Sequence, residues 1–103
     1  MDKKLLKDIM QWDVRNWSEA LEFWDRNVDW ENVHDCLELG ARDGGLSLWL
    51  GLKNKSVVCS DLENNRQWAE AYHKKYNLSS RIEYATVDAT NIPYENQFDV
   101  VTF

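Results

Sequence analysis

The stretch CLELGARDGGLS, from Cys36 to Ser47, decides the fold of this chain. It places glycines between an apolar run over residues 33–39, which predicts a strand, and a leucine-rich run over residues 46–52, which predicts a helix. Glycine lets the backbone turn tightly and approach a ligand, and free amides at a helix N-terminus attract negative charge. The sequence therefore predicts a strand–turn–helix unit that binds a nucleotide-like ligand.

Strand and helix patterns alternate outward from this unit. Strands are predicted over residues 56–61 and 82–89, with a helix from Asn64 or Asn65 between them, and a further strand begins near residue 97. A single helix between two strands forces the strands to pair in parallel. The pattern predicts an open α/β sheet whose ligand lies at the carboxyl ends of the strands.

The first third of the chain predicts helices. Residues 16–19, NWSE, have the spacing of a capping box, which would start a helix at Asn16. An apolar stripe at helical spacing follows, made of Trp17, Ala20, Leu21, Trp24 and Val28. We predict an N-terminal helical cap over residues 1–31 and a partial ligand-binding domain over residues 32–103.

Composition excludes several classes of protein. The 103 residues are 44% hydrophobic and 29% charged, which is ordinary for one globular domain. A formal net charge of -6 argues against a nucleic-acid partner, because phosphate binding relies on Lys and Arg. No apolar run reaches the roughly 20 residues that a membrane span needs, so we expect no membrane partner and a cytoplasmic protein.

The cysteines and histidines do not predict a metal site. Cys36 and Cys59 each lie inside an apolar strand and form no CxxC pair, so buried roles in a reducing compartment are expected. His34 and His73 have no partner at the spacing of metal ligands.

Arg42 separates the candidate nucleotide ligands. A dinucleotide fingerprint starting at Gly40 needs a second glycine at position 42, where the backbone approaches a pyrophosphate. A P-loop needs Gly-Lys-Ser/Thr, and none follows the turn. Both phosphate-binding interpretations are therefore weakened.

Residues 38–44, ELGARDG, resemble the first motif of class I S-adenosylmethionine (SAM) dependent methyltransferases, (D/E)xGxGxG. SAM carries an ammonium and a sulfonium and no pyrophosphate, so a carboxylate at Glu38 suits it. Arg42 departs from the motif at its middle glycine, and we expect its side chain to point to solvent. The resemblance covers residues 33–103 and implies a three-layer Rossmann-like parallel sheet, here partial, with strand order 3-2-1-4.

Three later features fall where that family has them. Asp61 ends a strand about 20 residues past the turn, the position of the family's ribose ligand. Asp88 and Ala89 resemble the segment that contacts adenine, and residues 96–103, NQFDVVTF, match the start of the fourth strand. Taken singly, Asp61 could also simply end a strand, and Asp88 could cap the turn before Pro93.

The resemblance thus implies SAM as the cofactor and a set of residues that bind it. They are Glu38, Gly40, Ala41, Gly44, Asp61, Leu62, Asp88 and Ala89. Trp12 and Trp17 are further candidates for a lid over the cofactor, because N-terminal helices in related enzymes often cover that pocket.

The implied function is transfer of a methyl group from SAM to an acceptor that the sequence does not identify. The chain stops inside the predicted fourth strand, before the segments in which the family holds its acceptor, so we expect a fragment that is inactive alone and self-associates through an exposed sheet edge. No residue is nominated as catalytic. The alternatives are a non-catalytic SAM-binding or protein-interaction half-domain and, less favoured, part of a nicotinamide oxidoreductase.

Overall fold

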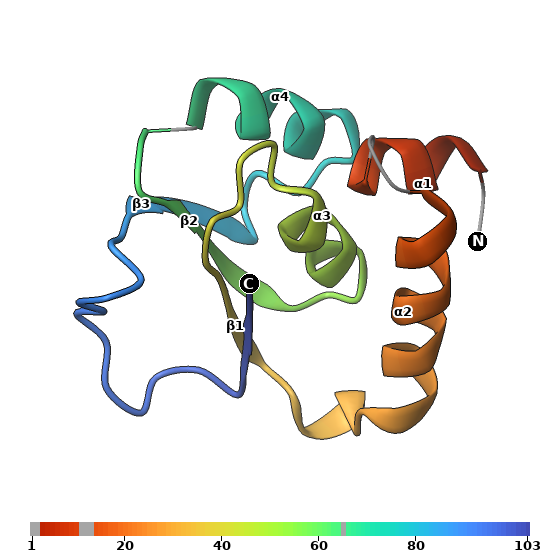
Figure 1. Ribbon diagram of the computed structural model, residues 1–103, viewed down its shortest axis with the longest axis horizontal. Helices are drawn as coiled ribbons and strands as arrows, with labels where there is room; N and C mark the ends of the chain where they lie inside the picture. Colours follow the sequence, from red (N-terminus) through yellow and green to blue (C-terminus); the bar gives the residue numbers. More distant parts are fainter. Residues whose placement is uncertain (1–2, 11–13, 65) are drawn as a thin grey trace.

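A parallel four-stranded sheet forms the centre of the protein (Figure 1). The computed structural model describes residues 3–10, 14–64 and 66–103. The strands are β1 (Asp35–Glu38), β2 (Ser56–Asp61), β3 (Ile82–Thr86) and β4 (Val100–Thr102). They lie in the order β3-β2-β1-β4, and all three pairings are parallel. The α/β class and the predicted strand order are confirmed.

Two helices connect the first three strands. Helix α3 (Gly45–Leu52) joins β1 to β2, and α4 (Arg66–Lys75) joins β2 to β3. Residues 87–99, which lead from β3 to β4, form turns and contain no helix. Strand β2 has the predicted bounds. The other three strands are shorter than predicted but lie within their predicted runs, since β1 begins at Asp35, β3 ends at Thr86 and β4 begins at Val100.

The two faces of the sheet are covered differently. Cys36 and Val57 point to the face where the helices pack, and their core also contains Ile9 of the first helix. Leu37 points to the opposite face, where the 87–99 segment lays Phe98 against it. The buried hydrophobic residues of all the helices belong to the first core, so the described residues supply the sheet and one of the two expected helical layers.

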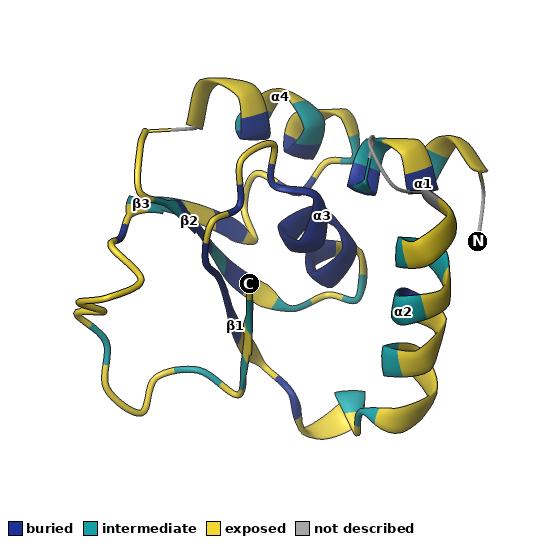
Figure 2. Ribbon diagram, in the orientation of Figure 1, coloured by how far each residue is buried: buried dark blue, intermediate teal, exposed yellow. Residues whose placement is uncertain are grey.

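Helix α3 is the most deeply buried element. Every residue from Gly45 to Gly51 is buried, and Figure 2 shows the helix dark blue around its circumference. It lies between the sheet and the N-terminal helices (Figure 1). A Cβ atom on Gly45 would lie 1.6 Å from the backbone oxygen of Ile9, so no other residue fits between these helices.

Three short elements precede the sheet: α1 (Lys3–Ile9), α2 (Val14–Asn27) and a 3-10 turn (Trp30–Asn32). The predicted capping box is wrong, because α2 already begins at Val14 and Asn16 lies within its first turn. Ser18, also inside the helix, donates its hydroxyl hydrogen bond back to the carbonyl of Arg15 at 2.8 Å. The division into residues 1–31 and 32–103 stays a prediction.

Tryptophans join α2 to α3. The ring of Trp24 lies 6.0 Å from that of Trp17 and 6.1 Å from that of Trp49, centroid to centroid. Trp30 meets Trp49 edge-on at 5.3 Å. Such aromatic pairs stabilise a fold beyond the area they bury. The predicted apolar stripe of α2 therefore packs as core.

Strand β4 leaves an open edge. It pairs with β1 on one side and has no strand partner on the other among the residues described. Val101 within the strand and Phe103 directly after it are 46% and 93% exposed. Asp99, just before β4, directs its carboxylate to the start of β1, where it accepts hydrogen bonds from the amides of His34 and Asp35 at 2.8 and 3.0 Å.

An apolar hollow of about 400 Å³ lies beside β4. It is lined by Trp24, Val28, Trp30, Trp49 and residues 100–103. The Nε1 atom of Trp30 and the hydroxyl of Thr102 are buried there without a hydrogen-bond partner.

In the parts of the chain that the structure describes, no helix is long and apolar enough to cross a membrane.

We expect the chain to self-associate through this edge, because unpaired strand amides and carbonyls beside apolar side chains recruit another strand. Sedimentation across a series of protein concentrations measures this. Val101→Lys should shift the chain toward monomer, whereas Phe23→Lys, at an exposed apolar position on α2, should not. A wild-type chain that stays monomeric at every concentration would contradict the expectation.

Candidate functional site

The turn between β1 and α3 has an unusual backbone. Gly40, Arg42 and Gly44 have φ angles of 61°, 51° and 75°, in the left-handed region. Glycine adopts this region freely, whereas Arg42 pays about 1 kcal/mol for it. Both motif glycines therefore stand where the backbone requires them, and Arg42 takes a glycine-like conformation at the position where the motif has a glycine.

Backbone hydrogen bonds fix the turn to its surroundings. The amide of Ala41 donates to the carbonyl of Ser60 on β2 at 2.9 Å. The amide of Gly44 closes the turn by donating to the carbonyl of Ala41 at 2.8 Å. The carbonyl of Gly44 then accepts from the amide of Leu48 at 2.9 Å, which starts α3.

The carboxylate of Glu38 holds the other side of the turn. Its Oε1 accepts hydrogen bonds from the amide and hydroxyl of Ser47 at 2.8 and 2.7 Å, so it caps the start of α3 from inside the protein. Glu38 is only 5% exposed, and burial raises its pKa to about 7 despite these bonds. The site therefore contains a carboxyl group that changes charge near neutral pH.

Asp61, at the end of β2, ties that strand to the turn. Its Oδ2 accepts from the amide of Arg42 at 2.8 Å, and its Oδ1 accepts from the amide of Leu62 at 2.7 Å. A carboxylate has about four acceptor positions, so two amide bonds leave capacity for a ligand. The side chain of Leu62 is 64% exposed beside it.

Two cavities flank the turn and share Arg42 and Asp43 in their walls. The first, of about 400 Å³, is lined by Asp8, Ile9, Met10, Trp17, Glu38, Leu39, Gly40, Ala41, Arg42, Asp43, Gly45, Leu46 and Phe103. The second, of about 450 Å³, is lined by Arg42, Asp43, Asp61, Leu62, Glu63, Asn64 and Trp68. Together they form a two-part site at the carboxyl ends of β1 and β2.

The predicted residues fall into three groups. Glu38, Gly40 and Ala41 line the first cavity, and Asp61 and Leu62 line the second. Gly44 lies in the turn but lines neither of them. Arg42 is exposed, as expected, and borders both.

Asp88 and Ala89 lie apart from both cavities. The Oδ1 atom of Asp88 accepts hydrogen bonds from the amide and hydroxyl of Thr90 at 2.9 and 2.7 Å. These bonds lower the pKa of the Asp88 carboxyl, which is fully exposed. Asp88 therefore caps a local turn, which is the alternative role that the sequence left open for it. Its contact with adenine stays a prediction.

Asp8 and Trp68 are among the cavity-wall residues that sequence reasoning missed. Asp8 receives hydrogen bonds from Lys75 at 2.8 Å and from Tyr76 at 2.6 Å, contacts that span most of the chain and leave no local pattern. Trp68 lines the second cavity and is 59% exposed. Trp68 lies beside the apolar stripe of α4, and this helix follows the predicted ribose residue Asp61. An aromatic residue at that position is a sequence signal that could have indicated a ligand contact.

Of the predicted lid residues, Trp17 lines the first cavity, and Trp12 lies outside the described residues. Within the described ranges, no group of three or more His, Cys, Asp or Glu side chains is placed to hold a metal ion.

Comparison with known proteins identifies similar solved structures. The PH0226 protein from Pyrococcus horikoshii OT3 has 26% sequence identity and a TM-score of 0.72 over 91% of this chain and 44% of its own. A putative SAM-dependent methyltransferase from Methanococcus maripaludis has 23% identity and a TM-score of 0.65 over 97% of this chain and 48% of its own.

The glycopeptide N-methyltransferase MtfA, solved with sinefungin, has 22% identity and a TM-score of 0.58 over 82% of this chain and 34% of its own. No family model and no curated protein matches the chain. The chain spans less than half the length of each of these solved structures. It has a partial fold of the kind found in SAM-dependent methyltransferases.

The raised pKa of Glu38 predicts a pH-dependent cost to stability. Between the ordinary pKa of glutamate and about 7, the folded chain binds more protons than the unfolded chain, so stability falls as pH rises through this interval. Glu38→Gln keeps an oxygen to accept from Ser47 and removes the charge. At about pH 8 the variant should be more stable than wild type by about 1–3 kcal/mol, with a much smaller difference near pH 5.

Urea unfolding at the two pH values measures this difference. Glu19→Gln is the matched control, because Glu19 is exposed on α2, and it should leave the pH dependence unchanged. Parallel stability curves for Glu38→Gln and wild type would show that Glu38 does not titrate near neutral pH.

Proposed function

We propose that this chain binds SAM across the turn of residues 39–44 and is the cofactor-binding portion of a SAM-dependent methyltransferase. The observation that carries the proposal is the pair of cavities that share Arg42 and Asp43 and flank this turn. SAM has the matching layout, with a charged methionine end and a nucleoside end joined at the sulfonium. The likeness to MtfA, which was solved with sinefungin and with S-adenosylhomocysteine, supports the same ligand class.

The first cavity suits the methionine end. The carboxyl groups of Glu38, Asp8 and Asp43 lie in its wall and attract the ammonium and sulfonium. Trp17 adds an aromatic wall, and aromatic faces attract cations. A bound cation stabilises the ionised form of Glu38, so binding would lower the raised pKa of this group.

The second cavity suits the nucleoside end. Asp61 can accept hydrogen bonds from the two ribose hydroxyls while it keeps its bonds to the turn. Leu62 and Trp68 are exposed apolar side chains in the same wall, where they can pack against a purine ring. Asp88 and Ala89 remain proposed adenine contacts, with Asp88 held in its own turn.

Methyl transfer is an in-line displacement at the sulfonium methyl, so the work of the protein is mainly to bind and orient the two reactants. The contribution of this chain is to hold the cofactor. The second candidate function is a SAM-binding or interaction half-domain without catalysis, favoured by the open edge of β4 and its apolar hollow.

The proposal predicts a preference among cofactors. SAM and S-adenosylhomocysteine should bind more tightly than NAD, because the carboxylates of the first cavity repel a pyrophosphate and Arg42 replaces the glycine that a pyrophosphate requires. Calorimetric titration with each ligand measures the affinities. Tighter binding of NAD than of SAM would end the methyltransferase proposal.

Asp61→Ala should weaken binding of S-adenosylhomocysteine by about 1–3 kcal/mol, because the ribose hydroxyls lose a hydrogen-bond acceptor. The matched control is Glu83→Ala, which removes an exposed carboxylate on β3 that lines neither cavity and should leave the affinity unchanged. Asp88→Ala, at the proposed adenine contact, should have a smaller effect than Asp61→Ala. Unfolding curves of these variants control for loss of fold. Unchanged affinity in Asp61→Ala together with lost binding in Asp88→Ala would show that the proposed ribose site is on the wrong strand.

A further inference from the structure

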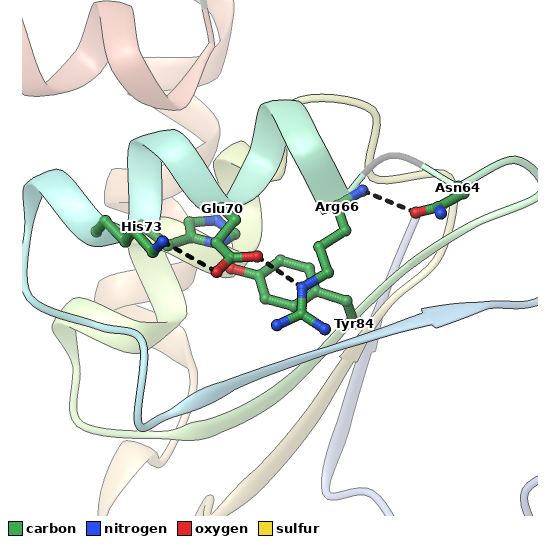
Figure 3. Close-up of polar contacts among 6 residues, drawn as sticks. Asn64, Arg66, Glu70, His73 and Tyr84 are labelled. Carbon is green, nitrogen blue, oxygen red and sulfur yellow. Dashed lines mark hydrogen bonds and ion pairs between the residues drawn. The ribbon is translucent and has the colours of Figure 1, made fainter.

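His73 lies directly beneath the turn. It belongs to α4, is fully buried, and places its Nε2 atom 2.8 Å from the carbonyl oxygen of Gly44. Its Nδ1 atom lies 2.6 Å from the hydroxyl of Tyr84 on β3. Figure 3 shows the Tyr84 ring below α4 with its hydroxyl directed toward the His73 ring. One imidazole therefore joins the turn, the helix and the strand.

The partners assign the protons of this chain of hydrogen bonds. The carbonyl of Gly44 can only accept, so Nε2 of His73 must carry a proton and donate. Burial lowers the pKa of His73, which keeps the ring neutral, so Nδ1 is an acceptor. Burial also raises the pKa of Tyr84 to about 12, so its hydroxyl keeps the proton that it donates to Nδ1.

The contact with Gly44 is also steric. A Cβ atom on Gly44 would lie 2.8 Å from both Cε1 and Nε2 of His73 and 3.0 Å from the Cβ of Ala69. The ring is thus packed against the bare backbone of Gly44, whose φ is 75°. The same carbonyl accepts from the amide of Leu48, so His73 fixes the peptide that starts α3.

Surface charges hold the outer side of this assembly. Arg66 lies over the Tyr84 ring at 5.2 Å from its centroid and donates to Glu70 at 2.6 Å, and Lys74 pairs with Glu70 at 3.3 Å (Figure 3). Exposed pairs of this kind contribute little to stability. Arg66 covers part of the Tyr84 ring, which is half-buried.

We propose that His73 is a positioning residue for the cofactor, which holds the Gly44 peptide in the orientation that gives the turn its ligand-binding shape, with Tyr84 fixing the tautomer of His73. The inference rests on the proposed function for its ligand and deepens it. This role distinguishes His73 from an ordinary core residue, because the Gly44 carbonyl that His73 holds belongs to the turn between the two cavities.

Two substitutions at His73 test this. In His73→Gln, the side-chain amide can place an N–H near the position of Nε2 and still donate to the Gly44 carbonyl. In His73→Phe, a ring of similar shape remains and the donor is lost. We expect affinity for S-adenosylhomocysteine to fall about tenfold in His73→Phe and to stay within about threefold of wild type in His73→Gln.

A readout without ligand accompanies the affinity. Hydrogen exchange of the Gly44 and Leu48 amides reports how well the turn is held, because both amides bond within it. Protection of these amides should fall in His73→Phe and be kept in His73→Gln. Tyr84→Phe, which keeps the aromatic ring and removes the hydroxyl, should lower protection by less than His73→Phe and serves if the latter does not fold.

Leu78→Ala is the control for general destabilisation. Leu78 is buried away from the turn, against Gly51, so its truncation should lower stability and leave the affinity unchanged. Unchanged turn protection in His73→Phe, or a Gln variant no better than Phe, would overturn the positioning role. A different outcome is that turn protection falls in His73→Phe but the wild-type chain binds no S-adenosylhomocysteine. That result would overturn the proposed function and the ligand part of this inference together.

Discussion

The rest of the structure depends on how the turn between β1 and α3 is held. Its backbone has left-handed φ angles at Gly40, Arg42 and Gly44, a shape that local propensity does not maintain. Glu38, Asp61 and His73, from three different elements, each hydrogen-bond the backbone of the turn or of the first residues of α3. This fixes the start of α3, which is buried on all sides between the sheet and the N-terminal helices.

The same bonds shape the candidate site. Glu38 and Asp61 spend part of their hydrogen-bonding capacity on the protein and still line the two cavities. Their structural roles explain why carboxylates are tolerated there, since a buried charge needs a partner. The remaining acceptor capacity is what a ribose or a cationic methionine end can use. Structural and ligand-binding roles are therefore carried by the same side chains.

Much of this fold could be predicted from the sequence, because hydrophobic periodicity and glycine placement are local signals. The strands, α3, α4 and the parallel pairing follow from them, whereas the strand order was implied by the resemblance to the methyltransferase family. The start of α2 was mispredicted at Asn16, because a capping pattern in the sequence does not exclude that the helix begins at an earlier residue, here Val14. The roles of Asp8 and His73 could not be predicted, because each is set by contacts with residues distant in sequence. Asp88 is different: the family resemblance predicts a ligand contact for it, but in the structure its carboxylate bonds within a local turn.

The central claim is that a SAM-like ligand lies across the turn and contacts both cavities. Backbone amide NMR shifts, followed while S-adenosylhomocysteine is added to the chain, test it most directly. The account predicts that the shifts gather at residues 39–44 and at Leu62, with the indole of Trp68 moving at the same ligand concentrations. Shifts confined to residues 100–103 and the hollow beside β4, with the turn unmoved, would contradict it.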